Sequence, residues 1–210
     1  VLGSMSLKGT TLQARYGNPL PRIAECTAGL INAIGLQNPG VDKVVGEEIP
    51  KLSEVYDGKV IANVGGHSFD EYVETVARFN DCDKVFAVEL NISCPNVKGG
   101  GMAFGTDPKT AQSLVYDVKK RAKKPIIVKL SPNVTSIADM AKAVRDGGAD
   151  GISLINTLVG MRIDLRTRKP VISVRTGGFS GPAVFPVAVR MVNAVSYTHL
   201  RAHETLRHLV

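Results

Sequence analysis

The stretch of the sequence with the clearest potential for chemistry runs from Asn91 to Asn96 and reads NISCPN. It sets the thiol of Cys94 between two carboxamides, just before the glycine-rich residues 99–101. A thiol has an ordinary pKa near about 8.5, so it can lose its proton at modest cost and act as a base. Carboxamides both donate and accept hydrogen bonds, so a pair of them can hold a flat amide or imide ring. The alternative is that Cys94 is a small core residue, as isolated cysteines often are.

The elements that must position this stretch alternate between short β-branched runs and helical patterns. Capping residues predict helix starts at Ser68, Asp107 and Ser136, and Gly147 with Gly148 predicts the end of the last helix. Regular alternation of this kind indicates a parallel sheet covered by helices, in either a doubly wound fold or a closed barrel. The predicted strands are residues 59–64, 85–92, 125–130 and 151–156.

Polar residues at the carboxyl ends of these strands favour the barrel. They are Asn63, Asn91, Lys129 and Asn156, about one βα unit apart. In a barrel all four would converge on one mouth, where barrel active sites are built, whereas the alternative is ordinary hydrophilic strand ends. We therefore predict an α/β fold of the (β/α)8 TIM-barrel type. Because a full barrel takes about 250 residues, a chain of 210 residues is expected to form an incomplete one.

Composition indicates a single folded domain. The chain is 44% hydrophobic and has no apolar run near the length of about 20 residues that a membrane helix needs. We expect a soluble, cytoplasmic protein without a secretory signal. Three cysteines without C-x-x-C spacing argue against a disulfide framework or a zinc site.

The basic residues of the chain have an ordinary interpretation. The formal charge is +7, and the one dense basic run, residues 119–124, closes a predicted helix. Positive charge there fits the helix dipole better than it fits a polyanion-binding patch.

Residues 195–210 hold three of the four histidines and continue no earlier pattern. A His-rich tract can bind metal, but we predict an unrelated tail after a domain of residues 1–194.

Several motifs in order resemble the catalytic subunit of class 1B dihydroorotate dehydrogenases. The resemblance runs from about residue 1 to 194. The motifs are TT at 10–11 with RYGNP at 15–19, NAIGLQNPG at 32–40, LNISCPNVK at 90–98, INTL at 155–158 with GMRID at 160–164, and TGGFSGP at 176–182.

The resemblance implies a barrel that binds FMN and oxidises (S)-dihydroorotate to orotate in the biosynthesis of UMP. Cys94 would remove a proton from C5 of the substrate while a hydride leaves C6 for the flavin. Electrons would pass to NAD+ through a partner subunit that carries FAD and a 2Fe-2S cluster. The implied assembly is a homodimer of catalytic subunits within a heterotetramer, with neither nucleic acid nor membrane as a partner.

The resemblance also implies the residues of the site. The substrate would contact Lys8, Asn32, Ala33, Ile34, Gly35, Leu36, Asn91, Asn96, Asn156 and Thr157. FMN would contact Lys8, Gly9, Asn63, Asn91, Lys129, Ile155 and Gly181. No metal ligand is expected. Alternatives remain for three of them: Lys129 in a structural ion pair, Lys8 as an exposed strand-end lysine, and Asn32 as a turn former.

Rival functions are a dihydropyrimidine dehydrogenase, a class 1A relative that reduces fumarate, and a fragment without catalysis. In the first rival a His is expected after Cys-Pro, where this chain has Asn96. The third rests on the expected absence of the first strand and of the last βα units, which would hold the flavin phosphate. Residues 176–178 are a weaker alternative phosphate site.

Overall fold

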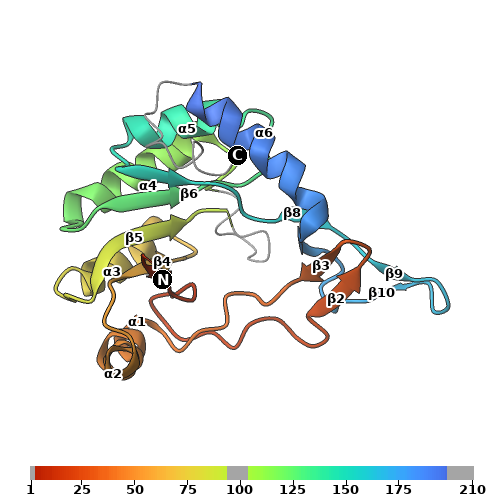
Figure 1. The fold of residues 1–210 in the computed structure, drawn as a ribbon, viewed down its shortest axis with the longest axis horizontal. Helices are drawn as coiled ribbons and strands as arrows, with labels where there is room; N and C mark the ends of the chain where they lie inside the picture. The colour runs from red at the N-terminus through yellow and green to blue at the C-terminus, as the bar shows by residue number, and fades with distance from the viewer. Residues whose placement is uncertain (1–2, 94–103, 198–210) are drawn as a thin grey trace.

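The computed structural model describes residues 3–93 and 104–197, and its centre is a five-stranded parallel sheet. The strands β1 (Met5–Ser6), β4 (Val60–Val64), β5 (Val85–Asn91), β6 (Ile126–Lys129) and β7 (Gly151–Ser153) pair in that order. Figure 1 shows them curving as one layer with helices along the outer side. A parallel sheet with consecutive strands as neighbours confirms the predicted incomplete barrel.

The helices begin where the capping residues predict. The side chains of Ser68, Asp107 and Ser136 accept hydrogen bonds from the backbone N–H three residues later, at 3.2, 2.8 and 3.2 Å. These residues precede α3 (Phe69–Phe79), α4 (Pro108–Arg121) and α5 (Ile137–Asp146), and the last helix ends at Gly147 as expected. Between β1 and β4 lie α1 (Val41–Lys43), a π-helical turn (Val44–Glu48) and α2 (Ile49–Val55).

The main core lies between the sheet and these helices. Side chains alternate along each strand, so that Leu90 and Val128 face the helices and are fully buried, while Glu89 and Lys129 lie on the other face and are partly exposed. Phe79, Leu114 and Val144 supply the helical side of the same core. The polar side chains of Glu89 and Lys129 therefore lie on the inner face of the sheet, away from the helices.

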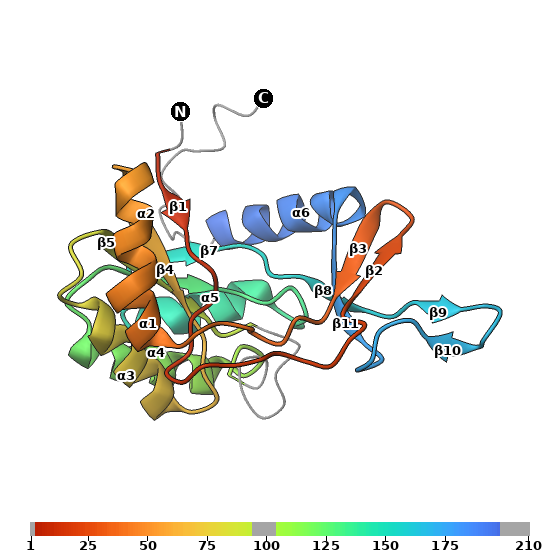
Figure 2. The same cartoon turned by 90° about the horizontal axis from the view of Figure 1, so that it is seen from below.

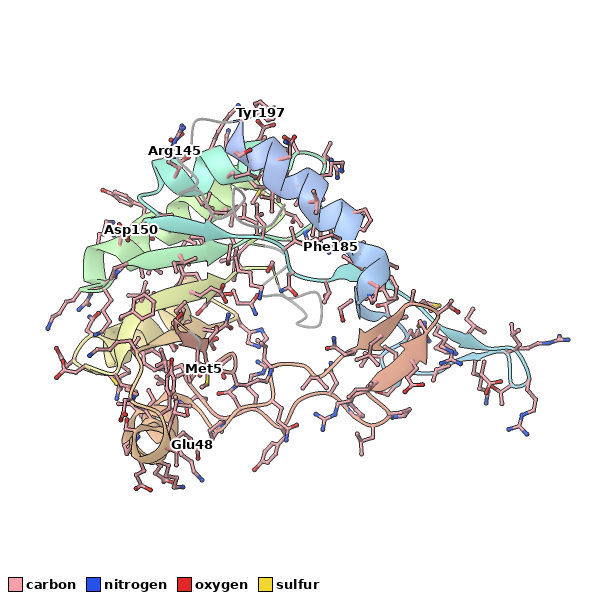
Figure 3. The ribbon with its side chains drawn as sticks, in the orientation of Figure 1. Met5, Glu48, Arg145, Asp150, Phe185 and Tyr197 are labelled. Carbon is pink, nitrogen blue, oxygen red and sulfur yellow. The ribbon has the colours of Figure 1, made fainter. Side chains whose placement is uncertain are left out.

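Asp150 fastens the amino ends of β6 and β7, opposite the strand ends that form the mouth (Figure 3). Its carboxylate accepts 2.7 Å hydrogen bonds from the Ile126 N–H and from Lys119 Nζ on α4. Partial burial raises the pKa of Asp150, but these hydrogen bonds and the positive charge of Lys119 outweigh it and hold the pKa below its usual value. The basic run at the end of α4 forms a further ion pair between Lys123 and Asp81, which fits a solvated helix end.

A second, antiparallel sheet extends from the barrel mouth, and sequence patterns do not predict it. Its strands are β2 (Ile23–Cys26), β3 (Gly29–Asn32), β11 (Gly177–Ser180) and β8 (Leu158–Gly160), in that order. The strands β9 (Ile163–Asp164) and β10 (Lys169–Pro170) form a hairpin that projects beyond it (Figure 2). A short 3₁₀ turn (Pro182–Val184) and α6 (Phe185–Ser196) then return the chain to α5.

Two details differ from expectation. The predicted strand 151–156 ends at Ser153, and the chain leaves the regular ladder there, although the Asn156 N–H still donates to Leu130 O at 3.1 Å. The alternative phosphate site at residues 176–178 is contradicted, because Gly177 and Gly178 lie inside β11, which pairs with β3 on one side and β8 on the other. Within the described residues, no helix is long and apolar enough to cross a membrane.

Candidate functional site at the barrel mouth

Glu89 joins three strands on the inner face of the sheet. Its Oε2 accepts a short hydrogen bond from Asn63 Nδ2 on β4, and its Oε1 accepts one of 2.6 Å from Ser153 Oγ on β7. Asn63 is the register partner of Glu89, whereas Ser153 lies across β6. Sequence reasoning found Asn63 but missed Glu89 and Ser153. An acidic residue inside a buried strand was the available signal for Glu89.

A second polar cluster lies at the end of β5. Asn156 Nδ2 donates to Asn91 Oδ1 at 3.2 Å and to Ser93 Oγ at 2.9 Å, and Ser93 Oγ donates to Asn91 Oδ1 at 3.2 Å. The fully buried Tyr72 of α3 donates its hydroxyl to Asn91 O at 2.8 Å, which ties this strand end to the helix layer. The predicted neighbours Asn91 and Asn156 are therefore in direct contact.

Lys129 lies between these clusters. Its Cα is in register with Asn91 on one side and Ser153 on the other, and its side chain is partly exposed. Among the described residues none forms an ion pair or hydrogen bond with its ammonium group. The alternative of a structural ion pair thus finds no acidic partner within the described ranges.

Asn32 and Thr157 approach each other across β11. Asn32 is the register partner of Gly178, and its Nδ2 donates to Gly178 O at 3.5 Å, at the limit of a hydrogen bond. A Cβ atom added at Gly178 would lie 2.0 Å from Thr157 Oγ1. The glycine is therefore required for Thr157 to pack where it does. Asn32 belongs to β3, so its role as a simple turn former is wrong.

Residues 33–36 turn sharply beside the mouth. Ala33 is fully buried, Ile34 partly so, and its carbonyl accepts from Asn18 N at 3.0 Å. Gly35 has φ of 77°, a conformation that favours glycine, and a Cβ there would lie 2.8 Å from the Asn18 side chain. The local backbone conformation and this close approach are enough to explain the glycine. Leu36 follows with φ of 55°.

Gly9 and Lys8 enter from β1. The chain runs along the end of β4, where Thr10 N donates to Asn63 O at 2.8 Å. A Cβ atom at Gly9 would lie 3.0 Å from Asn63 Oδ1 and 3.3 Å from Leu36 Cδ2, so only a glycine fits at this position without displacing these side chains. Lys8 is exposed, and its ammonium has no hydrogen-bond or ion-pair partner in the described ranges.

Asn133 is a further residue that sequence reasoning missed. Its Nδ2 donates to Thr157 O at 3.0 Å and its Oδ1 accepts from Val159 N at 2.9 Å. It thereby clamps the segment that follows β7 onto the loop that follows β6. The polar residues after the third predicted strand, SPN at 131–133, were the signal for it.

Two of the other predicted residues, Ile155 and Gly181, take no part in the hydrogen bonds described above. Ile155 packs against the main core, while Gly181 has φ of 127° and lies against Ala28 and Gly29 in the second sheet. Cys94 and Asn96 lie outside the described residues, so their predicted roles are not placed by the structure.

A cavity of about 370 Å³ opens beside the site, between β1 and the π turn with α2. Met5 and Glu48, both labelled in Figure 3, are on its wall, together with apolar side chains such as Ile49. It contains Lys8 but not Asn63, Asn91 or Lys129. The polar cluster on the inner face of the sheet is therefore the better candidate for chemistry.

The polar cluster fits a flat heteroaromatic cofactor such as a flavin. The carboxamides of Asn63 and Asn91 lie at neighbouring strand ends, next to Lys129, whose ammonium pairs with no described residue. They offer acceptors, donors and a cation at one end of the sheet. A flavin ring carries carbonyl and imide groups that such side chains can pair with. Within the described residues no group of His, Cys, Asp or Glu is arranged to hold a metal ion.

Comparison with known proteins identifies the family. The family model described as dihydroorotate dehydrogenase matches residues 1–203. The chain belongs to the dihydroorotate dehydrogenase family. Among curated members, the chain is 58% identical over 196 residues to "Dihydroorotate dehydrogenase B (NAD(+)), catalytic subunit" of Anoxybacillus flavithermus. It is 57% identical to the protein of that name from Enterococcus faecalis and 56% identical to that from Bacillus cytotoxicus.

These dihydroorotate dehydrogenases are longer than the chain. The alignment to the Anoxybacillus protein covers 93% of this chain and 62% of that protein. The family assignment confirms the resemblance drawn from the motifs and the barrel fold that it implies. The predicted domain boundary near residue 194 stays a prediction.

Proposed function

We propose that the chain forms the flavin-binding and substrate-binding part of a dihydroorotate dehydrogenase that oxidises (S)-dihydroorotate to orotate. The observation that supports this most is the contact of Asn91 with Asn156 at the barrel mouth, beside Lys129, whose ammonium pairs with no described residue. The ring of dihydroorotate carries an imide group and a carboxylate, so carboxamide side chains and a cation can bind it. The carboxamide of Asn91 and the exposed ammonium of Lys8 can supply these contacts.

The orientation of the carboxamides supports a division of roles. Asn91 Oδ1 accepts from Asn156 and Ser93, and no described residue accepts from its Nδ2, which we propose donates to a ligand. Asn156 uses both amide protons inside the cluster, and its Oδ1 accepts from Thr157 N at 2.8 Å. We infer that Asn91 contacts the ring of the substrate directly and that Asn156 holds it in place. Asn32, Thr157 and residues 33–36 would close the other side of the pocket.

For the cofactor, we propose that FMN lies over Gly9 and Asn63 with the Lys129 ammonium at its edge, and that Lys8, Asn91, Ile155 and Gly181 complete the contacts. Bound FMN supplies the acceptor for the hydride that leaves C6 of the substrate. Lys129 would stabilise negative charge at the ring edge. Cys94 is proposed to take the C5 proton, with Asn96 beside it at the substrate.

Partner subunits follow from the same proposal. The relatives are named as NAD(+)-dependent catalytic subunits, which supports an electron-transfer partner that carries FAD and a 2Fe-2S cluster and reduces NAD+. A homodimer of catalytic subunits within a heterotetramer, and a cytoplasmic location, stay predictions. Within the described residues Cys26 is a free thiol on β2 and Cys82 is a free thiol between α3 and β5, and neither belongs to a group of residues arranged to hold a metal ion.

An absorbance experiment tests the function. The purified chain is mixed with FMN under anaerobic conditions, and dihydroorotate, dihydrouracil or neither is added. We expect flavin that binds and bleaches with dihydroorotate alone, and bleaching slowed by at least about a hundredfold in Cys94→Ala, as loss of a general base does. The matched control is Cys26→Ala on β2 of the second sheet.

Each other outcome has a defined meaning. Bleaching by dihydrouracil would favour the dihydropyrimidine dehydrogenase alternative. Flavin that binds and is not reduced by either substrate would reject the proposed reaction. Failure of the chain to bind FMN, while the full-length Anoxybacillus relative binds it, would identify the chain as a fragment without catalysis.

A further inference from the structure

Glu89 is a carboxylate on the inner face of the sheet with neutral partners. Its two oxygens accept from Asn63 Nδ2 and from Ser153 Oγ, and no described cation lies within ion-pair distance. It is half-buried, and removing a charge from water without a counter-charge is costly. A Gln or Leu would fill similar space at lower cost, so packing alone does not explain the charge.

The negative charge of Glu89 determines the orientation of the Asn63 carboxamide. An ionised carboxylate only accepts hydrogen bonds, so the amino group of Asn63 must face Glu89 and its Oδ1 must face the opposite way. That oxygen lies close to Gly9, where an added Cβ would be 3.0 Å from it. None of the described residues donates a hydrogen bond to Asn63 Oδ1.

We propose that Glu89 is a positioning residue that fixes Asn63 with its carbonyl oxygen toward the bound flavin, so that the site accepts a hydrogen bond from the imide N3–H of the ring. This inference rests on the proposed FMN site. In an oxidised flavin ring the imide N–H is the one ring donor, and the remaining polar atoms of the ring accept. The carbonyl oxygen of Asn63 can therefore pair with the imide N–H of the flavin, whereas the amino group of Asn63 could not. Ser153 holds the second oxygen of Glu89 and keeps the carboxylate in place.

The first test needs no flavin. Hydrogen exchange of the Asn63 side-chain amide is followed by NMR in the chain and in its Glu89→Leu and Glu74→Leu variants. Glu74 is exposed on α3 and serves as the matched control. We expect exchange at Asn63 to accelerate at least about tenfold in Glu89→Leu, because its acceptor is gone, and to stay unchanged in Glu74→Leu. Unchanged exchange in a folded Glu89→Leu protein would overturn the proposal.

The second test uses FMN and N3-methyl-FMN as probes. The ratio of their dissociation constants is measured by flavin fluorescence in the wild type, in Glu89→Gln and in Glu74→Gln. A Gln at position 89 can pair with either orientation of Asn63, so the carboxamide is no longer fixed. We expect the wild type to disfavour the methylated flavin and Glu89→Gln to reduce that ratio by about fivefold to tenfold.

The steric effect of the methyl group is common to all three proteins and cancels in this comparison. An equal ratio in the wild type and in Glu89→Gln would overturn the proposal even if FMN binds well. Loss of FMN binding in the wild type would instead count against the proposed function, and the exchange experiment would still decide the orientation of Asn63.

Discussion

Asn156 donates both of its side-chain amide protons within the site, to Asn91 Oδ1 at 3.2 Å and to Ser93 Oγ at 2.9 Å. The two asparagines are 65 residues apart in the chain and belong to different βα units. Because Asn91 Oδ1 accepts from Asn156, and its Nδ2 has no acceptor among the described residues, Nδ2 is the group that we expect to face a ligand. Asn156 thus determines which group of the Asn91 carboxamide can bind a ligand.

The Asn156→Asp variant tests this relationship. A carboxylate at position 156 cannot donate to Asn91, so we expect Asn91 to turn its amino group toward the carboxylate and its carbonyl toward the ligand. The dissociation constant of orotate, measured by the change in flavin absorbance, should rise by at least about tenfold. The control is Asn193→Asp, because Asn193 is exposed on α6. Equal orotate binding in both variants would contradict the role of Asn156.

A second prediction concerns the close packing of Gly178 against Thr157. An Ala at position 178 would bring its Cβ to 2.0 Å from Thr157 Oγ1, so Thr157 must move and β11 must adjust. We expect Gly178→Ala to lower the free energy of unfolding in urea by about 1–3 kcal/mol, as overpacking does. Orotate affinity should fall as well, because Thr157 belongs to the proposed pocket.

Gly46→Ala is the matched control for this substitution. Gly46 lies in the helical segment before α2, and a Cβ there meets no heavy atom within 4 Å. We expect this variant to be neutral or stabilised by up to about 1 kcal/mol, because Ala loses less backbone entropy in a helix. A Gly178→Ala protein as stable as Gly46→Ala, with unchanged orotate binding, would show that Thr157 has room to move.

The barrel portion was predictable because its signals are local. The N-caps at Ser68, Asp107 and Ser136 fix helix starts within a few residues, and β-branched runs mark the strands between them. Asn91 and Lys129 end their strands, so their convergence followed from parallel pairing alone. Asn156 was expected on a strand and lies beyond one, but it still reaches the same cluster.

The second sheet was not predictable because its pairing is long-range. Its strands are two to four residues long with the hairpin included, too short for a periodic pattern. The contact of Asn32 with Gly178 joins residues 146 positions apart. Glu89 was missed for a related reason, since its partners Asn63 and Ser153 belong to strands on either side of it.

A third prediction concerns the charge of Lys129. Removing it in Lys129→Met should weaken FMN binding about tenfold and make the bound flavin harder to reduce by about 30 mV, because the cation stabilises the negative charge of the reduced ring. The potential is measured by anaerobic titration against a reference dye. Lys142→Met on the exposed face of α5 is the control, since among the described residues Lys142 pairs with Asp139, outside the site. An unchanged potential in Lys129→Met would leave the lysine with a structural role.

The last prediction concerns Asp150 and acid stability. Hydrogen bonds from Ile126 N–H and Lys119 hold the pKa of Asp150 below its usual value despite the opposing effect of burial. A group with a lowered folded-state pKa stabilises the fold above its unfolded pKa of about 3.9, and this stabilisation is lost as pH falls through the folded-state value.

Asp150→Asn should therefore lower the free energy of unfolding at pH 7 by about 1 kcal/mol, a modest effect because the pair with Lys119 is partly exposed. The variant should also lose less of its free energy of unfolding than the wild type between pH 7 and pH 3. Urea unfolding at both pH values measures this, with Asp57→Asn as the exposed control of equal charge change. If Asp150→Asn and Asp57→Asn lose the same stability on acidification, Asp150 does not contribute to the acid response of the fold.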